Sequence, residues 1–491
     1  MHLLEQLCFL AIVCVGCEAL QRFSGSASST KTRLSASFLG NMFGGNAKAS
    51  SPVPAFVDKA PSWSELDVLL RSLEPVEERR EYEDKKVHGR GGSNHKANLR
   101  LFDAPDGFDP TVTLYRDQAA WCPYCEKVWL QLEEKRIPYK IVKNPLSCYG
   151  DKSPEFFRVS PSGQLPVAEI NGRLVSESNT IMSVLEEEFP SHKPLLPPAG
   201  SKEREKVPGL LRLERRVFGS WFSWLTSRAG GGGAAAEMHG LFLEVDAALQ
   251  ASGGPYFLGS DISFVDVMFT PFLERMAASL PYFKGFQCRC ATYPHLLKWY
   301  EAMDTRPAYV GIKSDYYSHV HDLPPQIGGC HFNPESAPFR EEIDGGAWDV
   351  AKDASECLEP MLPADPDVAR RDAARQLLDN AANVVKFACR GAGAEGRPKV
   401  RAELADPRAV SNLDLVPAVD CALRHVVSGL LAAQQQQRDE GDKASELPAR
   451  SEVEACLIYL RNRVGVPRDM TVHGARQLRA HINHFVSSNL Q

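Results

Sequence analysis

The sequence predicts a mixed α/β domain, then an all-helical domain, then a further and mainly helical extension. Three observations predict this order. Between residues 111 and 195, short apolar strands alternate with helices in the order β-α-β, then β-β-α. From about 203 to 330 the apolar residues recur at helical spacing, and beyond His331 the chain becomes Ala-rich and helical again.

The α/β segment can be divided into individual elements. The Asn171-Gly172 pair predicts a two-residue hairpin, because both turn positions favour a positive φ. The first helix has Val128, Trp129 and Leu132 on one side and charged residues on the other. This order is that of a thioredoxin-like domain. The predicted elements are strands at 112–115, 139–142, 167–170 and 173–176, and helices at 125–135 and 179–188.

The helical segments are marked by caps and loops. Ser263 and Asp266 form a capping box, and the run of glycines at 230–233 predicts a loop between two helices. The aromatic residues of this region have the spacing of a helical core, or of the wall of an acceptor pocket; they include Trp221, Trp224 and Trp299. In the extension, helices are predicted near 366–390, 414–434, 451–463 and 472–487.

The N-terminal segment has the composition of a two-part targeting leader. Residues 7–17 are almost wholly apolar but too few to span a bilayer, and no acidic residue occurs between Ala19 and Asp58. A signal peptide followed by a transit peptide predicts import into a plastid; secretion is the alternative. Next, Ser62 and Glu65 form a capping box for a short helix, which a charged and mobile linker is expected to follow. We therefore divide the chain into a leader (1–60), a helix and flexible linker (61–110), a thioredoxin-like domain (111–195), a helical domain (203–330) and an extension (331–491).

The composition excludes some classes of function. The 491 residues are 43% hydrophobic with a formal net charge of -6, which describes a globular chain of two or three domains and argues against nucleic acid as a partner. We expect no membrane association once the leader is removed. Of the 13 cysteines, those after the leader are scattered, so no disulfide framework is implied.

One cysteine pair carries chemistry. Cys122-Pro123-Tyr124-Cys125 lies where the first strand gives way to the first helix. Unpaired N–H groups and the helix dipole converge there and stabilise a thiolate. This placement predicts Cys122 as the exposed nucleophile and Cys125 as a resolving thiol. The alternatives are two structural thiols or half of a zinc site. Because no second pair of this spacing follows the leader, we expect no metal.

The order of several motifs resembles the glutathione transferase superfamily. These are Tyr115-Arg116-Asp117, Trp121 with the cysteine pair, 163–167 (Gly-Gln-Leu-Pro-Val) and 176–181 (Ser-Glu-Ser-Asn-Thr-Ile). A cysteine at the first position is similar to the omega, lambda and dehydroascorbate-reductase classes. The segments 319–325 and 466–470 resemble chloroplast glutathione-transferase-like proteins of plants and algae. The resemblance implies a glutathione-transferase C-terminal domain over 203–330, glutathione as co-substrate and a homodimer as a possible assembly.

The resemblance also implies a set of glutathione-binding residues. Pro166 corresponds to a cis proline that lets the main chain of Leu165 pair with glutathione as a strand would. Glu177 and Ser178 correspond to the residues that hold the γ-glutamyl end, although Ser178 is alternatively a simple helix cap.

Two further positions belong to this implied set. Lys152 falls near the lysine that contacts the glycyl carboxylate; the alignment also allows Ser153, or a surface lysine with no role. Tyr124 lines the opening beside the sulfur. A later group, His319, His321, Cys330 and His331, fits no standard zinc spacing.

These observations predict a glutathione-dependent thiol transferase or reductase, in which Cys122 forms a mixed disulfide with glutathione. Its other partner is an unidentified small-molecule or disulfide acceptor. The alternatives are conjugation of glutathione to electrophiles, and a binding or scaffold module without chemistry.

Overall fold

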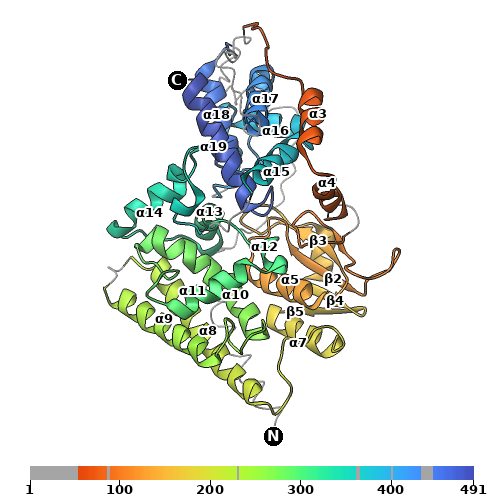
Figure 1. Ribbon diagram of the computed structural model, residues 1–491, viewed down its shortest axis with the longest axis vertical. Helices are drawn as coiled ribbons and strands as arrows, with labels where there is room; N and C mark the ends of the chain where they lie inside the picture. Colours follow the sequence, from red (N-terminus) through yellow and green to blue (C-terminus); the bar gives the residue numbers. More distant parts are fainter. Residues whose placement is uncertain are drawn as a thin grey trace, which may run out of the picture. The chain divides into compact units, whose positions relative to one another are not determined.

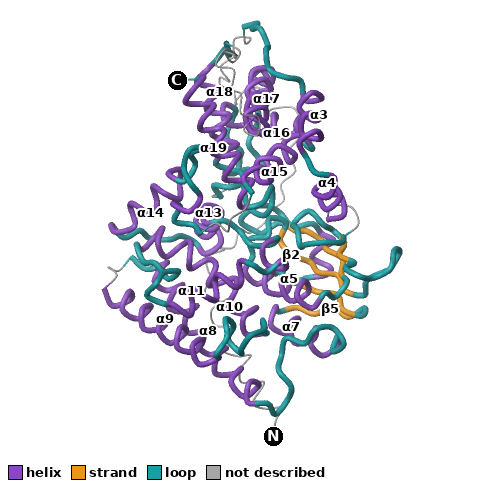
Figure 2. The backbone as a smooth tube through the Cα atoms, in the orientation of Figure 1, coloured by secondary structure: helices purple, strands orange, loops and turns teal. Residues whose placement is uncertain are grey.

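The computed structural model describes residues 54–85, 89–228, 232–360, 365–399, 402–432 and 446–490. The leader predicted over 1–60 lies almost wholly outside the described residues. Within the described chain the strands are confined to one sheet and the remaining regular elements are helices, as Figure 2 shows.

The α/β domain contains a five-stranded mixed sheet in the order β1-β3-β2-β4-β5. The central strand β2 runs parallel to β3 and antiparallel to β4, and Leu114 faces Ile141 on one side and Ala168 on the other. Asn171 and Gly172 have φ values of 51° and 78°, which confirms the predicted hairpin. The strands are β1 (Leu99–Arg100), β2 (Val112–Asp117), β3 (Tyr139–Asn144), β4 (Val167–Ile170) and β5 (Arg173–Ser176).

Three helices accompany the sheet, and two of them position the functional site. Helix α5 contacts β2, and α7 contacts both β4 and β5; the two helices also contact each other (Figure 1). The helices are α5 (Pro123–Lys135), α6 (Pro154–Val159) and α7 (Ser178–Glu188). The predicted thioredoxin-like order of elements is therefore confirmed.

The helical domain follows, and its apolar side chains join those of the sheet in one core. Ser263 and Asp266 form the predicted capping box at the start of α10. Trp221, Trp224 and Trp299 are each no more than 3% exposed and belong to this core. The helices are α8 (Lys202–Thr226), α9 (Gly232–Ser252), α10 (Phe264–Ser279), a π-helix at Leu280–Lys284, α11 (Pro294–Asp304), α12 (Pro307–Val310) and α13 (Tyr316–Ile327).

The extension has a second core of its own. Leu66 and Leu70 from the N-terminal helix α3 are buried in it, together with apolar residues of α15 to α19. Residues 413–432, which comprise α17 and the turn before it, are long and apolar enough to cross a membrane. Helix α17 nevertheless contacts α3, α15, α16, α18 and α19, as a core helix of a folded domain does. The helices are α3 (Trp63–Leu73), α4 (Val76–Glu83), α14 (Ala337–Glu341), α15 (Pro366–Leu378), α16 (Ala381–Ala388), α17 (Val416–Ala432), α18 (Arg450–Arg461) and α19 (Val472–Asn489).

The structure differs from the expectation of a mobile linker before the sheet. The chain forms α4 and then β1, an edge strand that pairs with β3. Arg100, 1% exposed, donates to both carboxylate oxygens of Glu133 at 2.8 and 2.9 Å. A charged and Gly-rich composition did not reveal this packing, because each buried charge has a partner far along the chain.

A second difference concerns the predicted helix at 366–390, which is two helices, α15 and α16. The break falls at Asn380, which has a φ of -143° and caps α16. Asn and Asp side chains compete with the helical backbone and favour such boundaries. A continuous apolar periodicity concealed the break.

A third difference concerns α5, because its charged side is buried. Every residue from Cys125 to Lys135 is buried, since α7, α10 and α12 cover the side that was expected to face water. Each buried charge therefore needs a partner. The pairs are Glu126 with Arg275, Lys127 with Asn179, Glu133 with Arg100, Glu134 with Arg306 and Lys135 with Glu186.

Candidate functional site

The site is built on the N-terminus of α5, where Cys122 is the N-cap. Its backbone is extended, with φ -77° and ψ 116°, and its sulfur accepts a hydrogen bond from the N–H of Cys125 at 3.4 Å. Pro123 occupies the first turn, where its missing N–H costs nothing. The first N–H groups of α5 and the positive end of the helix dipole are directed toward this sulfur. Cys122 is only 5% exposed, so the expectation of an exposed nucleophile is wrong and the residue is recessed.

Cys125 is buried more deeply and remains a thiol. It is 1% exposed, and burial together with the hydrogen bond to Cys122 raises the pKa of Cys125 well above its ordinary value. It therefore needs help from a base before it can attack a disulfide.

Asp117 lies beside both sulfurs at the end of β2. A carboxylate oxygen of Asp117 and the two sulfurs lie within 4.8 Å of one another. One oxygen, Oδ2, accepts the N–H of Trp121 at 2.6 Å. The other, Oδ1, is buried and has no hydrogen-bond partner among the described residues. These three donors are one fewer than a structural zinc site uses.

The loop before β4 supplies main-chain groups on the sheet side of the site. The Leu165-Pro166 peptide bond is cis, as predicted. In the described part of the chain the N–H and C=O of Leu165 make no backbone hydrogen bond, and Val167 then pairs with Tyr115 of β2. An unpaired peptide group beside a sheet edge can accept an extended ligand.

The start of α7 supplies polar groups. Glu177 is exposed and has a φ of 65°, a strained conformation for a residue with a side chain. Strain of this kind is commonly kept at functional sites. Ser178 is the first residue of α7 and is 7% exposed, so the N-cap position belongs to Glu177 and not to Ser178.

The remaining predicted residues lie around this opening. Tyr124 is 38% exposed and packs edge-on against Phe272. Lys152 donates to Ser147 at 3.0 Å, and partial burial lowers its pKa. Ser153, the other residue that the alignment allows, caps α6 through the N–H of Phe156.

Sequence reasoning missed Lys127. Its side chain is buried, its ammonium donates to Asn179 at 2.6 Å, and burial lowers the pKa of Lys127 to about 8. It lies within electrostatic reach of both Cys122 and Glu177. The only signal in the sequence was a lysine in the second turn of the helix that follows the cysteine pair.

The predicted histidine group is not assembled into one site. His319 is buried and contacts Glu274 at 2.5 Å, whereas His321 contacts Asp344 at 2.8 Å and also Glu403. In the described part of the chain, the group of metal-type ligands that lies together is Asp117, Cys122 and Cys125.

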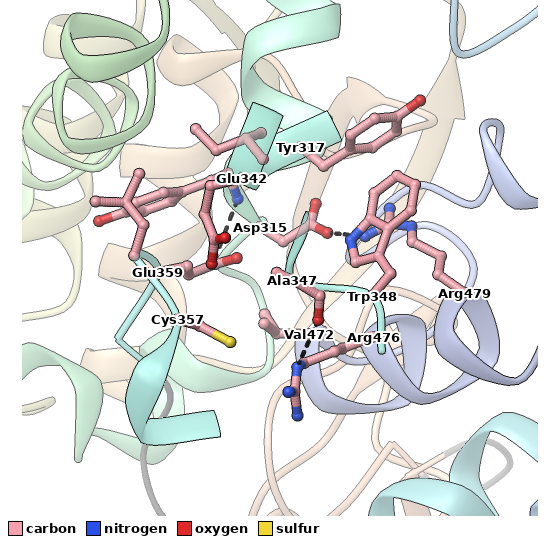
Figure 3. A pocket seen from close by; sticks show the side chains of 13 residues that line it. Asp315, Tyr317, Glu342, Ala347, Trp348, Cys357, Glu359, Val472, Arg476 and Arg479 are labelled. Carbon is pink, nitrogen blue, oxygen red and sulfur yellow. Dashed lines mark hydrogen bonds and ion pairs between the residues drawn. The ribbon is translucent and has the colours of Figure 1, made fainter. Parts of the chain in front are cut away.

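A separate cavity lies between α13, the segment 342–359 and α19 (Figure 3). Asp315, Glu359 and Arg479 contribute charged groups to its wall. Its volume of about 20 Å³ is room for a water molecule and for no organic ligand. It is a packing defect between the helical domain and the extension.

Comparison with known proteins identifies two domains in this part of the chain. Residues 121–188 match the family model of the glutathione S-transferase N-terminal domain, and residues 214–302 match that of the C-terminal domain. The chain is therefore a glutathione-transferase-like enzyme over its central part.

Two curated proteins and one solved structure show which glutathione transferases this chain resembles. Glutathione S-transferase DHAR2 of Arabidopsis thaliana is 28% identical over 165 residues, which cover 34% of this chain and 71% of that protein. The chloroplastic glutathione S-transferase DHAR3 of the same plant is 25% identical over 208 residues, covering 42% and 75%. Among solved structures, the glutathione transferase Omega 3C of Trametes versicolor has a TM-score of 0.38 at 24% identity, covering 42% of this chain and 86% of that one.

Proposed function

We propose that the chain is a glutathione-dependent thiol transferase or reductase and that Cys122 is its nucleophile. The single observation that carries this is the sulfur of Cys122 at the N-terminus of α5, where it accepts the N–H of Cys125 at 3.4 Å. A serine or tyrosine hydroxyl at this position would stay protonated at neutral pH and could not take part in disulfide exchange, which needs a sulfur nucleophile. The kinship to the DHAR proteins supports the same chemistry.

The reaction is a thiol–disulfide exchange. The Cys122 thiolate attacks the glutathione sulfur of a glutathionylated substrate, forms a Cys122–glutathione disulfide and releases the substrate as a thiolate, which takes up a proton. The thiolate of a second glutathione then attacks the glutathione sulfur of that intermediate. Oxidised glutathione leaves and the Cys122 thiolate is restored. In a second route, Cys125 gives up its proton, attacks the sulfur of Cys122 and expels glutathione as its thiolate, which takes up a proton; a Cys122–Cys125 disulfide remains. Two further molecules of glutathione reduce that disulfide and leave as oxidised glutathione.

Glutathione is bound by groups that surround Cys122. The free main chain of Leu165, presented by Pro166, pairs with the cysteinyl part. Glu177 accepts the γ-glutamyl ammonium, and Ser178 with the first N–H groups of α7 donates to its carboxylate. Lys152 meets the glycyl carboxylate.

In the proposed site Tyr124 lines the opening beside Cys122; it is 38% exposed and its ring packs edge-on against Phe272. The buried ammonium of Lys127 lies 5.5 Å from the centroid of the same ring. An acceptor would therefore approach Cys122 past an aromatic ring.

The decisive experiment is intact-mass analysis after incubation with oxidised glutathione. The wild-type protein should gain one glutathione on Cys122, and Cys125→Ser should gain it and retain it longer. Cys122→Ser should gain none and should lose disulfide reductase activity. Full reductase activity in Cys122→Ser would overturn the proposal.

The same variants separate the competing functions. In a conjugating enzyme, Cys122→Ser would preserve or raise the reaction with an electrophile, because a hydroxyl can hydrogen-bond the glutathione thiolate. In a scaffold, neither substrate would turn over in the wild type. We further propose that the protein acts in a plastid, on the composition of residues 1–60 and the chloroplastic relative.

A further inference from the structure

We infer that residues 464–469 of the extension, here called the anchor loop, are part of the active site. By holding Trp121, they set the position and reactivity of the neighbouring Cys122 sulfur. The inference rests on the proposed role of Cys122. It assigns a function to a segment that lies outside both matched glutathione S-transferase domains.

The anchor loop contacts the side chain of Trp121 from three positions. The indole N–H of Trp121 donates to the C=O of Val466 at 2.9 Å. The guanidinium carbon of Arg468 lies 4.8 Å from the centroid of the indole ring. Gly465 lies so close that a Cβ at this position would be 2.4 Å from an atom of the indole. Trp121 and Val466 are both 0% exposed, so this contact is fully buried.

The anchor loop is itself fixed, so it can hold another residue in place. The N–H of Val466 donates to the hydroxyl of Ser318 at 2.9 Å, and its C=O also accepts the hydroxyl of Ser314. The N–H of Gly465 donates to Asp469 at 2.8 Å. The loop is therefore clamped to the start of α13 and closed on itself.

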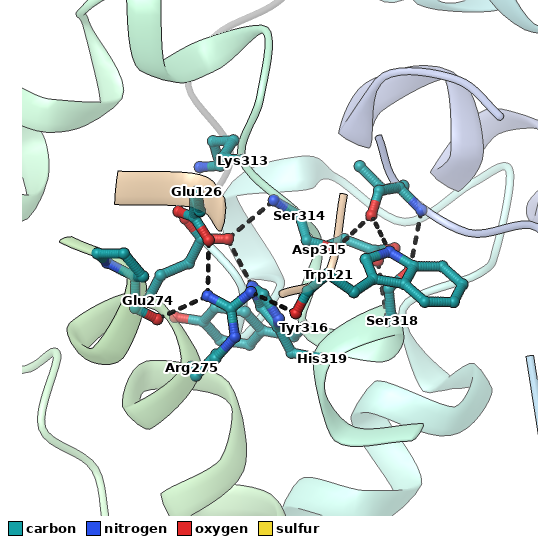
Figure 4. Close-up of polar contacts among 12 residues, drawn as sticks. Trp121, Glu126, Glu274, Arg275, Lys313, Ser314, Asp315, Tyr316, Ser318 and His319 are labelled. Atoms are coloured by element: carbon teal, nitrogen blue, oxygen red, sulfur yellow. Dashed lines mark hydrogen bonds and ion pairs between the residues drawn. The ribbon is translucent and has the colours of Figure 1, made fainter. Parts of the chain in front are cut away.

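The backbone of Trp121 is held from the other side. Its N–H donates to Asp117 at 2.6 Å, and its C=O accepts from Arg275 at 2.9 Å and from Gln326 at 3.1 Å. Figure 4 shows the contact with Arg275, which also pairs with Glu126 of α5. Trp121 is thus fixed at both backbone groups and at its ring.

The residue before Trp121 shows why this fixation matters. Ala120 has a φ of 65°, a strained conformation that persists only where the surroundings enforce it. If Trp121 were released, the strain would relax through the residues that follow, and Cys122 is the next one. A displacement of about 1 Å can cost roughly 100-fold in rate at a reacting atom.

Two substitutions test this from opposite sides of the contact. Gly465→Ala pushes a methyl group against the indole, and Trp121→Phe removes the indole N–H and the outer ring atoms while keeping an aromatic side chain. Gly240→Ala in α9 is the matched control, because a Cβ there meets nothing within 4 Å. The readouts are the rate of alkylation of Cys122 by iodoacetamide in a Cys125→Ser background, kcat and KM for glutathione-dependent disulfide reduction, and the urea midpoint.

We expect Gly465→Ala to slow the alkylation of Cys122 and to lower kcat, each by about tenfold or more, with little change in the KM for glutathione. Combining it with Trp121→Phe should restore alkylation to the level of Trp121→Phe alone, because the phenyl ring leaves room for the methyl group. Gly240→Ala should match the wild type.

A lower urea midpoint with unchanged alkylation and kcat would overturn the inference and reduce the contact to packing. Absence of rescue in the double variant would overturn it as well. If Gly465→Ala does not fold, the test rests on Trp121→Phe alone. An alkylation rate and a kcat equal to those of the wild type in Trp121→Phe would then overturn the inference. Failure of the proposed function is recognised separately, because alkylation reports on the Cys122 thiol even when the wild type forms no glutathione adduct.

Discussion

Of the two site cysteines, Cys125 is the more deeply buried, which bears on the proposed route in which it attacks Cys122. Burial raises the pKa of the Cys125 thiol, so the route that uses Cys125 requires a proton acceptor. Asp117 lies beside it: one of its carboxylate oxygens is within 4.8 Å of the Cys125 sulfur, and its Oδ1 is buried without a hydrogen-bond partner among the described residues. We therefore predict that, in the proposed second route, the proton of Cys125 passes to Asp117 while Cys125 attacks the Cys122 sulfur and glutathione leaves as its thiolate.

Asp117→Asn should therefore slow the release of glutathione from the Cys122 adduct in the absence of added glutathione. A positioned base contributes about 100-fold or more, so a loss of at least tenfold is expected. The asparagine oxygen still accepts the N–H of Trp121, which keeps the loop in place. Rapid-quench mass spectrometry of the adduct measures the rate.

The Cys125→Ser background provides the control for this prediction. There the adduct is resolved by added glutathione alone, and Asp117→Asn should have no further effect. An equal loss in both backgrounds would mean that the substitution deforms the loop and that Asp117 is not the acceptor.

Glu177 should be the main charged contact for the γ-glutamyl end of glutathione. Glu177→Ala removes a charge-assisted hydrogen bond worth about 1.5–3 kcal/mol, roughly a 10- to 100-fold loss of affinity. The substitution leaves the backbone strain at position 177 unchanged, because alanine disfavours a positive φ as much as glutamate does. Isothermal titration with glutathione, with the exposed Glu187→Ala of the same helix as control, measures the change. Unchanged affinity would place the γ-glutamyl site elsewhere.

At this scale the sequence could locate residues whose chemistry is local. Cys122 and Cys125 stand out by their spacing and their place before a helix, and Pro166 by its place before a strand. Lys127 and the contact between Trp121 and Val466 could not be found this way. The first requires knowing that α5 is buried on all sides, and the second joins residues 345 positions apart.

Among the elements, α13 is tied to the extension by a histidine whose charge depends on pH. The His321 side chain is 14% exposed and contacts Asp344 and Glu403. Burial lowers the pKa of His321, but the hydrogen bonds that its ring donates to these two carboxylates outweigh burial and raise this pKa to about 9.

This pKa shift predicts a pH-dependent stability. A histidine whose folded pKa is raised from 6.5 to about 9 contributes stability that is complete below pH 6.5 and is lost as the pH rises through 9. The urea midpoint of the wild type should therefore fall between pH 6.5 and 9, and that of His321→Gln should fall less. Parallel curves for the two proteins would contradict the prediction.

The elements also show where local patterns are sufficient. Strands β2 to β5 and the 171–172 hairpin follow from residues close in sequence, and the structure has them where they were expected, whereas β1 was not predicted. The side of α5 that carries Glu126 and Glu133 reads as solvent-facing in isolation. Only the packing of α10 and of the segment around Arg100 reverses that, and neither is encoded within the helix.

For the whole molecule, the leader predicts a shortened mature protein. A signal core followed by an acid-free segment is removed on import, so N-terminal sequencing of the protein from its source should give a start between about 20 and 60. A start at Met1 would contradict the plastid proposal.

The division into an α/β domain, a helical domain and an extension could be read from the periodicity of the sequence. The role of the extension could not be predicted from the sequence, because its contact with the site depends on one short loop among many helices. Apolar periodicity shows which face of a helix is buried, but it does not identify the surface that buries it.

The order in which the chain is made has a consequence for α3. Trp63 of this helix donates to Asp420 at 2.8 Å, a partner 357 residues later. At a synthesis rate of about 5–20 residues per second, α3 waits on the order of 20–70 s for the helices that cover Leu66 and Leu70. During that interval the apolar stripe of α3 lacks the helices that cover it. Of the described helices, the first to be made is thus among the last to be covered, and the extension's core can close only when the C-terminal helices have been made.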